Sequence, residues 1–412
     1  MLLHLLAALA AVVLLGRILG RLFRVIHQPP VIGEVVAGIV LGPSLLGSLW
    51  PDAYAFILPA SVAPSLGLLS QLGVALYMFL VGVELDTDMF RGQIRSTAAI
   101  ALSSIALPFV LGVWLATQLY AELAPSGVAS THFALFVGVA MSITAFPVLA
   151  RILADQGITQ TALGRLALTC AAIADVTAWC LLALVVGVVQ SSEGRGLLTS
   201  VLTVAFIALM FGVVRPVVER VSQRWASREP ERGAIALVLV AALLSALATE
   251  AIGVHAIFGA FLFGAVVPHQ GALARALEQR IEYVVTILLL PAFFAFAGMR
   301  TEIGLLTGVH AWLICGALIA VATVGKFGGT LLAARATGHE WRRSTELGLL
   351  MNTRGLMELI VLNVGLDLGI ISPALFTMMV LMAIVTTMAT TPMLRAVQVS
   401  EAVRARARLE TP

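Results

Sequence analysis

Four charged residues lie inside long apolar stretches of this 412-residue sequence: Asp175, Lys326, Arg354 and Glu358. Asp175 stands among small and apolar residues, and Lys326 is the only lysine among 25 basic residues. A charged side chain at the centre of a bilayer costs at least about 2.5–3.5 kcal/mol, and such residues mark ion pathways or proton relays. The pattern therefore indicates an acid and an amine that bind and release protons or small cations inside a membrane.

The four residues differ in what their types and spacing allow. An amine can lose its proton when it is desolvated, whereas a guanidinium cannot, so a lone lysine in an arginine-rich chain favours a chemical role for Lys326 over chance. Arg354 and Glu358 are four positions apart, which places them on one helix face. We expect them to pair in the core, and a purely structural ion pair is as compatible with this spacing as a role in transport.

Small hydroxyl residues and helix breakers provide further oxygen ligands near these charges. The segment 141–147 contains Ser142, Thr144 and a proline, and the segment 351–358 contains Asn, Arg, Gly and Glu. Backbone unwound at this depth is tolerated only where it is buried in protein or lines a cavity. We predict two interrupted helices there, with Asp175, Ser142, Thr144 and Thr177 as ligands of a bound Na⁺ or K⁺. The alternative is a proline kink beside a structural ion pair.

The composition excludes most other classes of protein. Hydrophobic residues make up 60% of the chain and charged residues only 11%, whereas a soluble domain has about 25% charged residues. No nucleophile–base set is present, and Cys170, Cys180 and Cys315 lack the spacing of metal ligands. Arginines are spread over many short loops, without the clustered basic face of a nucleic-acid-binding protein. We therefore predict no enzyme, no cofactor and no nucleic-acid partner; the partners are the lipid bilayer and small inorganic cations.

Thirteen apolar segments are long enough to cross a bilayer as helices, given the roughly 20 residues that a span needs. The first is predicted to be a retained span and not a cleaved leader. The segments lie at 2–23, 30–46, 65–84, 96–120, 133–154, 162–189, 197–217, 233–251, 253–268, 281–299, 308–333, 344–366 and 372–393.

The basic residues indicate the orientation of these spans. Alternate loops carry 21 of the arginines, and the opposite loops carry only Arg195 and Arg300. Because cytoplasmic loops are enriched in Lys and Arg, we predict that the N-terminus is outside and the C-terminus cytoplasmic, in the cell (inner) membrane.

The two halves of the chain resemble each other weakly. Three pairs of segments align in the same order, with offsets between about 211 and 222 residues. The pairs are 31–42 with 253–264, 79–84 with 294–300 and 172–175 with 383–386. Seven spans separate the partners, an odd number, so the repeats have inverted topology. The predicted fold class is an all-α polytopic membrane protein with thirteen transmembrane helices and two inverted repeats, each with a broken helix.

A single buried acid is sufficient to couple two ions. If Asp175 binds either a proton or a metal cation, and its empty anion is too costly to carry across the barrier, the protein reorients only when it is loaded. The result is obligatory cation/proton exchange, with Lys326 pairing with the acid in the empty state. Two alternatives remain: a sodium-coupled symporter of an organic anion and a cation channel.

Four motifs over nearly the whole chain resemble signatures of the monovalent cation:proton antiporter 2 family, which includes Kef-type proteins and plant cation/proton exchangers. They are Gln-Pro-Pro-Val-Ile-Gly-Glu at 28–34 followed by Gly-Pro-Ser at 42–44, Phe-Leu-Val-Gly-Val-Glu-Leu-Asp at 79–86, His-Ala-Ile-Phe-Gly-Ala-Phe at 255–261, and Asn-Thr-Arg-Gly-Leu-Met-Glu-Leu-Ile-Val-Leu-Asn at 352–363. The resemblance implies a homodimer with crossed broken helices. It also implies that Asp175 binds the ion, with Lys326 and Thr144 beside it.

The resemblance further implies a core that moves like an elevator against a scaffold. The corresponding segments are 1–95 (scaffold and dimerisation), 96–190 (core), 191–232 (linker and basic connector), 233–305 (scaffold and dimerisation), 306–395 (core) and 396–412 (cytoplasmic tail). In one respect the chain departs from the family pattern, because Ala174 stands where a polar or acidic residue precedes the essential acid. A single acid favours electroneutral, one-for-one exchange.

Overall fold

The computed structural model describes residues 2–84, 94–190, 196–223, 232–268 and 271–409. Within these ranges the regular structure is helical and contains no strand, so the all-α prediction is confirmed. The α-helices are α1 (Leu2–Val25), α2 (Pro30–Leu41), α3 (Pro51–Ile57), α4 (Ala63–Glu84), α5 (Ile94–Leu123), α6 (Ser130–Ser142), α7 (Phe146–Asp155), α8 (Ala162–Gln190), α9 (Gly196–Leu209), α10 (Arg215–Gln223), α11 (Arg232–Ile252), α12 (Ala256–Val266), α13 (Ala272–Val284), α14 (Leu290–Met299), α15 (Gly308–Ala336), α16 (Trp341–Met351), α17 (Leu356–Asp367) and α18 (Pro373–Leu409). Short π-helical turns cover Pro43–Gly47, Met210–Val214 and Val285–Leu289, and 3₁₀ turns cover Ala60–Val62 and Ile303–Leu305.

Most predicted spans correspond to helices of sufficient length. Across the described ranges, eleven helical stretches are long and apolar enough to cross a membrane, or twelve if the bent pair α16–α17 counts as one span. The remaining predicted span, 253–268, corresponds to α12, which has only 11 residues. At 1.5 Å per residue α12 is about 16 Å long, half of the roughly 30 Å hydrocarbon core. The total of thirteen spans therefore stays a prediction, as do the inverted repeats.

The chain divides into two compact units. The first contains the described residues of 1–16, 37–88 and 179–299. In this unit glycines let α2 and α14 approach closely, because a Cβ at Gly38 would lie 2.0 Å from the carbonyl oxygen of Phe294, and one at Gly298 would lie 2.1 Å from that of Gly38. Small residues at such crossings are typical of helix packing in membranes.

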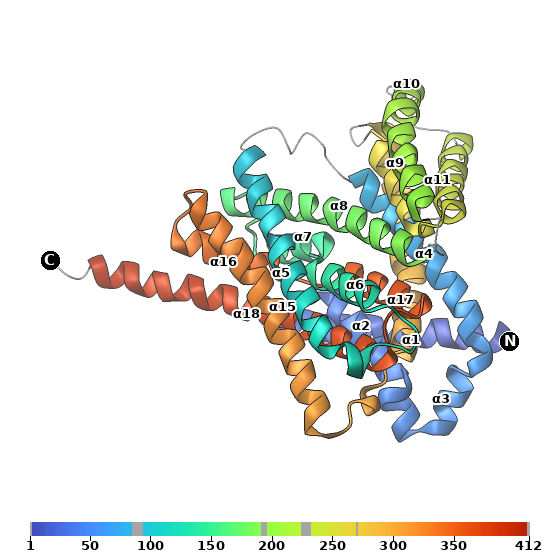
Figure 1. Ribbon diagram of the computed structural model, residues 1–412, viewed down its shortest axis with the longest axis horizontal. Helices are drawn as coiled ribbons and strands as arrows, with labels where there is room; N and C mark the ends of the chain where they lie inside the picture. The colour runs from blue at the N-terminus through green and yellow to red at the C-terminus, as the bar shows by residue number, and fades with distance from the viewer. Residues whose placement is uncertain (1, 85–93, 191–195, 224–231, 269–270, 410–412) are drawn as a thin grey trace. The chain divides into compact units, whose positions relative to one another are not determined.

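The second unit contains the described residues of 17–36, 89–178 and 300–412, and it holds every predicted site residue. In this unit α5 and α15 lie side by side (Figure 1). Gly325 and Gly329 of α15 face α5, where Cβ atoms would lie 2.8 Å from Pro108 Cα and 2.6 Å from Ser103 O. The hydroxyl of Ser103 donates to the Gly329 carbonyl at 2.9 Å. Lys326, which follows Gly325 in α15, is itself 0% exposed.

Two spans of the second unit are interrupted where the sequence predicts. Residues 143–145 separate α6 from α7, and residues 352–355 separate α16 from α17, which are bent by 45°. Pro147 is the second residue of α7, where the missing N–H would have no helical partner in any case. The proline therefore begins a new half-helix and does not kink a continuous one.

The predicted division into scaffold, linker, core and tail segments stays a prediction. Residues 224–231 of the basic connector and 410–412 of the tail lie outside the described residues. The described part of the predicted tail continues α18 as far as Leu409.

Candidate functional site

The two helix interruptions are joined by a backbone hydrogen bond. The N–H of Ala145, in the first interruption, donates to the carbonyl oxygen of Thr353, in the second, at 3.1 Å. Groups freed from a helix need such partners, because unpaired polar backbone is costly at this depth. The contact joins the two interruptions from which the half-helices α6, α7, α16 and α17 extend.

Two buried cations cap the C-terminal end of α6. Arg354 donates to the carbonyl oxygens of Ala140 at 3.4 Å and Met141 at 2.6 Å, and the ammonium of Lys326 donates to that of Ser142. The last carbonyls of a helix have no intrahelical partner and carry the negative end of the helix dipole. Both cations are therefore stabilised by the interrupted backbone.

Arg354 also pairs with Glu358, as their spacing suggests. The guanidinium lies 3.1 Å from a carboxylate oxygen of Glu358, and both side chains are 0% exposed. Glu358 lies in the first turn of α17, where the positive end of the helix dipole favours an acid. Its other oxygen, Oε1, has no hydrogen-bond partner in the described chain.

Asp175 is buried without a direct partner. Its residue is 2% exposed, and neither carboxylate oxygen has a hydrogen-bond partner among the residues that the structure describes. Two groups nevertheless act on its charge: the ammonium of Lys326 and the backbone N–H of Phe146, the first residue of α7. The N–H of Phe146 is therefore close enough to act on the acid, but it makes no hydrogen bond of normal geometry with either oxygen. A carboxylate in this state is chemically able to bind a proton or a desolvated cation.

The predicted oxygen ligands are not equally available. The hydroxyl of Thr144 is buried in the first interruption and has no partner in the described ranges, so its oxygen is free to ligate. The hydroxyls of Ser142 and Thr177 donate to carbonyls of their own helices, Val139 O and Ile173 O, each at 2.7 Å. Thr177 is two positions from Asp175 on α8, and residues at that spacing do not face each other. The role of Thr177 as a ligand stays a prediction.

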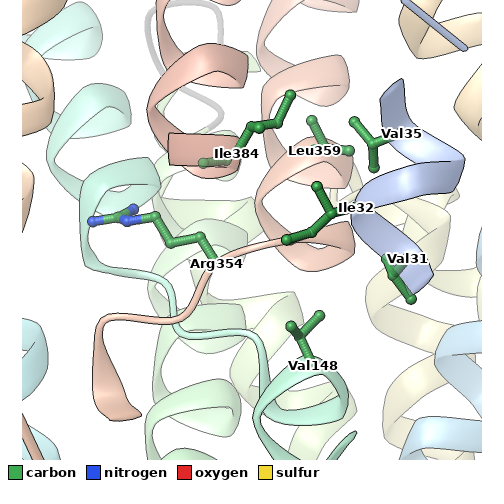
Figure 2. Close-up of a pocket in the computed structure, with 9 residues that line it drawn as sticks. Val31, Ile32, Val35, Val148, Arg354, Leu359 and Ile384 are labelled. Atoms are coloured by element: carbon green, nitrogen blue, oxygen red, sulfur yellow. The ribbon is translucent and has the colours of Figure 1, made fainter. Parts of the chain in front are cut away.

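A small apolar cavity lies beside the second interruption. It measures about 10 Å³, close to the space that one water needs. Its lining residues are Val31, Ile32, Val35, Val148, Arg354, Gly355, Leu359, Ala383 and Ile384. Figure 2 shows that the guanidinium of Arg354 points away from the labelled apolar side chains. Apolar side chains therefore surround Arg354 on the side of the cavity, and its guanidinium points to the C-terminal end of α6.

One important contact was missed at the sequence level. The hydroxyl of Thr387 on α18 accepts from the N–H of Arg354 at 2.8 Å and donates to the carbonyl of the same residue at 2.7 Å. The available signal was a threonine pair, Thr386 and Thr387, in the middle of an apolar span. Such a pair usually bonds within its own helix, as Thr386 does to Met382 O at 2.8 Å.

Buried charges around two interrupted membrane helices define a class of protein, the secondary transporters. Comparison with known proteins identifies the family within this class. The profile of the transmembrane sodium/hydrogen exchanger family matches residues 9–397. The chain therefore belongs to the sodium/hydrogen exchanger family, whose members are membrane transporters and not enzymes. The family prediction made from the motifs is confirmed.

Named relatives are similar over most of this chain. It is 43% identical to the Na⁺/H⁺ antiporter NhaS4 of Synechocystis, over 95% of this chain and 96% of that protein. It is 41% identical to cation/H⁺ antiporter 18 of Arabidopsis thaliana, over 94% of this chain but 48% of the plant protein. The chain thus spans about half the length of this plant relative.

A solved structure shares the fold. The sodium proton antiporter MjNhaP1 of Methanocaldococcus jannaschii matches with a TM-score of 0.64, over 99% of both chains. With 14% identity, this match concerns the arrangement of helices alone.

Proposed function

We propose that this protein is a secondary-active antiporter that exchanges a monovalent cation, Na⁺ or K⁺, for protons, with Asp175 binding the two ions in turn. The observation that carries the proposal is the state of Asp175: a buried carboxylate whose oxygens make no hydrogen bond of normal geometry in the described chain, with the backbone N–H of Phe146 and the side chain of Lys326 as the groups that act on it. An ionised carboxylate is strongly disfavoured in such a place unless it is neutralised. The antiporter names of the relatives support the same activity.

Coupling follows from the cost of the empty anion. Either a proton or an alkali cation removes the uncompensated charge, so the loaded states cross the membrane barrier and the empty one does not. Only one ion fits on the acid at a time, because both bind the same oxygens. Exchange is then obligatory. A channel would need a continuous pore, and a symporter of an organic anion would need a binding site for that anion; the site around Asp175 supplies neither by itself.

Lys326 and the hydroxyl residues assist this cycle. The ammonium donates to Ser142 O and is close enough to Asp175 to act on its charge; when the site is empty, it moves onto the acid. An arriving cation displaces it and takes oxygens from Asp175 and Thr144, with Ser142 and Thr177 as further ligands. Alkali cations are hard ions that prefer such oxygen ligands.

The transport cycle that we propose is an elevator movement. Thirteen spans form two inverted repeats, and the core segments 96–190 and 306–395 carry the site past a scaffold that also forms a homodimer. The excess of arginine on alternate loops supports an outside N-terminus and a cytoplasmic C-terminus in the cell membrane. Ala174, which leaves Asp175 without an adjacent acid, supports an electroneutral one-for-one exchange.

Proteoliposomes that contain a pH-sensitive dye test this function. With the wild type, addition of Na⁺, K⁺ or Li⁺ outside should drive protons out of the vesicle lumen and raise the pH that the dye reports. Asp175→Asn should abolish this pH change while the protein stays folded. Asp155→Asn is the matched control, because Asp155 is a surface acid of α7, 44% exposed and paired with Arg151. Exchange that survives in Asp175→Asn would refute the role of Asp175. A rate that responds to an imposed membrane potential would refute electroneutrality alone.

A further inference from the structure

The hydroxyl group of Thr387 on α18 hydrogen-bonds to the backbone of the second helix interruption. Thr387 is buried on α18, and its hydroxyl satisfies both backbone groups of Arg354: it accepts from the N–H at 2.8 Å and donates to the carbonyl at 2.7 Å. A threonine hydroxyl has one proton to donate and lone pairs that accept, so both bonds can form at once. This arrangement clasps residue 354 of the interruption to α18.

The clasp leads by contiguous contacts to the proposed cation site. Thr353, next to Arg354, accepts the N–H of Ala145 at 3.1 Å, and Ala145 directly follows Thr144. Thr144 supplies the free hydroxyl oxygen. Two peptide units and one hydrogen bond therefore separate the hydroxyl on α18 from this ligand on the other interrupted span.

The side chain of Arg354 provides a second route. Its guanidinium donates to Met141 O at 2.6 Å and to Ala140 O at 3.4 Å, directly before the carbonyl of Ser142 that Lys326 occupies. The position of the Arg354 backbone thus also influences the position of the last carbonyls of α6. Both routes converge on residues 141–145.

We propose that Thr387 is a positioning residue for cation binding: its hydroxyl fixes the backbone of Arg354, and through it the place of Thr144 and the end of α6. The inference rests on the function proposed above for Asp175. Removing the hydroxyl frees two buried backbone groups, which must seek other partners and so shift the interruption.

The expected consequence is a change in affinity. An alkali cation is held by the sum of several oxygens at fixed distances, so a misplaced Thr144 weakens binding. We expect Thr387→Val to raise the cation concentration for half-maximal exchange about tenfold, equivalent to roughly 1.4 kcal/mol of binding free energy. A threonine that only stabilised the fold would lower the amount of active protein, and so the maximal rate, without changing this concentration.

The test compares Thr387→Val, Thr387→Ser and the control Thr386→Val in proteoliposomes at fixed pH. Thr386 is the neighbouring buried threonine, and its hydroxyl bonds to carbonyls of its own helix at 2.8 and 3.2 Å. Thr387→Ser keeps the hydroxyl and should keep the wild-type half-maximal concentration, as should Thr386→Val. If Thr387→Val does not fold, Thr387→Cys, with its weakly bonding thiol, should fold and show a smaller rise.

The outcomes separate this inference from the proposed function. An unchanged half-maximal concentration in Thr387→Val, or in Thr387→Cys where the valine variant does not fold, overturns the positioning role while Asp175-dependent exchange in the wild type persists. A rise that Thr387→Ser shares also overturns it, because the hydroxyl would not be its cause. Absence of Asp175-dependent exchange in the wild type would instead refute the proposed function.

Discussion

The buried pair of Arg354 and Glu358 allows a quantitative test of how the site is held together. In the variant Arg354→Met, the carboxylate of Glu358 keeps no hydrogen-bond partner among the described residues. The carbonyl of Met141 loses the guanidinium, and that of Ala140 keeps only the N–H of Ile143 at 3.5 Å. Because both side chains are 0% exposed, no water replaces these bonds. Removing one partner of such a pair costs about 3–5 kcal/mol, which is roughly a 10²- to 10⁴-fold shift towards unfolding.

The double variant Arg354→Met/Glu358→Leu should recover much of that loss. Apolar replacement of a whole buried ion pair is often neutral, because no charge remains to be desolvated. The measurement is equilibrium unfolding of the purified protein in mixed micelles of increasing denaturing detergent, followed by circular dichroism. A coupling free energy of at least about 2 kcal/mol is expected from the four-member cycle. The reasoning is refuted if Arg354→Met is as stable as the wild type, or if the two single losses simply add.

Two further predictions concern a ligand and a helix crossing. Thr144→Val should raise the half-maximal cation concentration about tenfold and leave the protein at least as stable, because it removes a buried hydroxyl that has no partner in the described chain; Thr144→Ser should behave as the wild type, and a less stable valine variant would contradict this view of the site. Gly329→Ala should destabilise by about 1–3 kcal/mol, since its Cβ would lie 2.6 Å from Ser103 O. Gly316→Ala on the same helix meets nothing within 4 Å and should be neutral or stabilising by up to about 1 kcal/mol; thermal unfolding in detergent distinguishes the two, and equal effects would show that the crossing does not set the cost.

Much of the site was predictable because membrane burial makes charge informative. A bilayer-depth charge is costly, so the four charged residues stood out without any knowledge of contacts. Helix periodicity then placed Arg354 beside Glu358, and the proline and glycine signals placed both interruptions. These arguments depend on local spacing along the chain, which the sequence displays directly.

Contacts between distant segments were beyond such reasoning. The sequence suggested Asp175 as the partner of Lys326 in the empty state, and this pairing stays a prediction; it gave no sign of the Ser142 carbonyl, to which the ammonium donates in the structure. Nothing in the spacing distinguishes these partners, because they are 151 and 184 positions away from the lysine. The same limit hid Thr387, whose partner is 33 positions away. The short α12 was also unexpected, since apolar length alone does not show where a helix begins and ends.

The arrangement of charges follows the half-helices and explains why a solitary acid can persist here. Arg354 and Lys326 lie at the carbonyl end of α6, Glu358 lies at the amino end of α17, and the first N–H of α7 acts on the charge of Asp175. Each charge thus meets the helix terminus of opposite sign. Three of them also have a direct hydrogen-bond partner, and Asp175 has none in the described chain. The interrupted backbone thus acts on this carboxylate without a hydrogen bond of normal geometry, which leaves its oxygens available for the exchange of a proton and a cation that we propose.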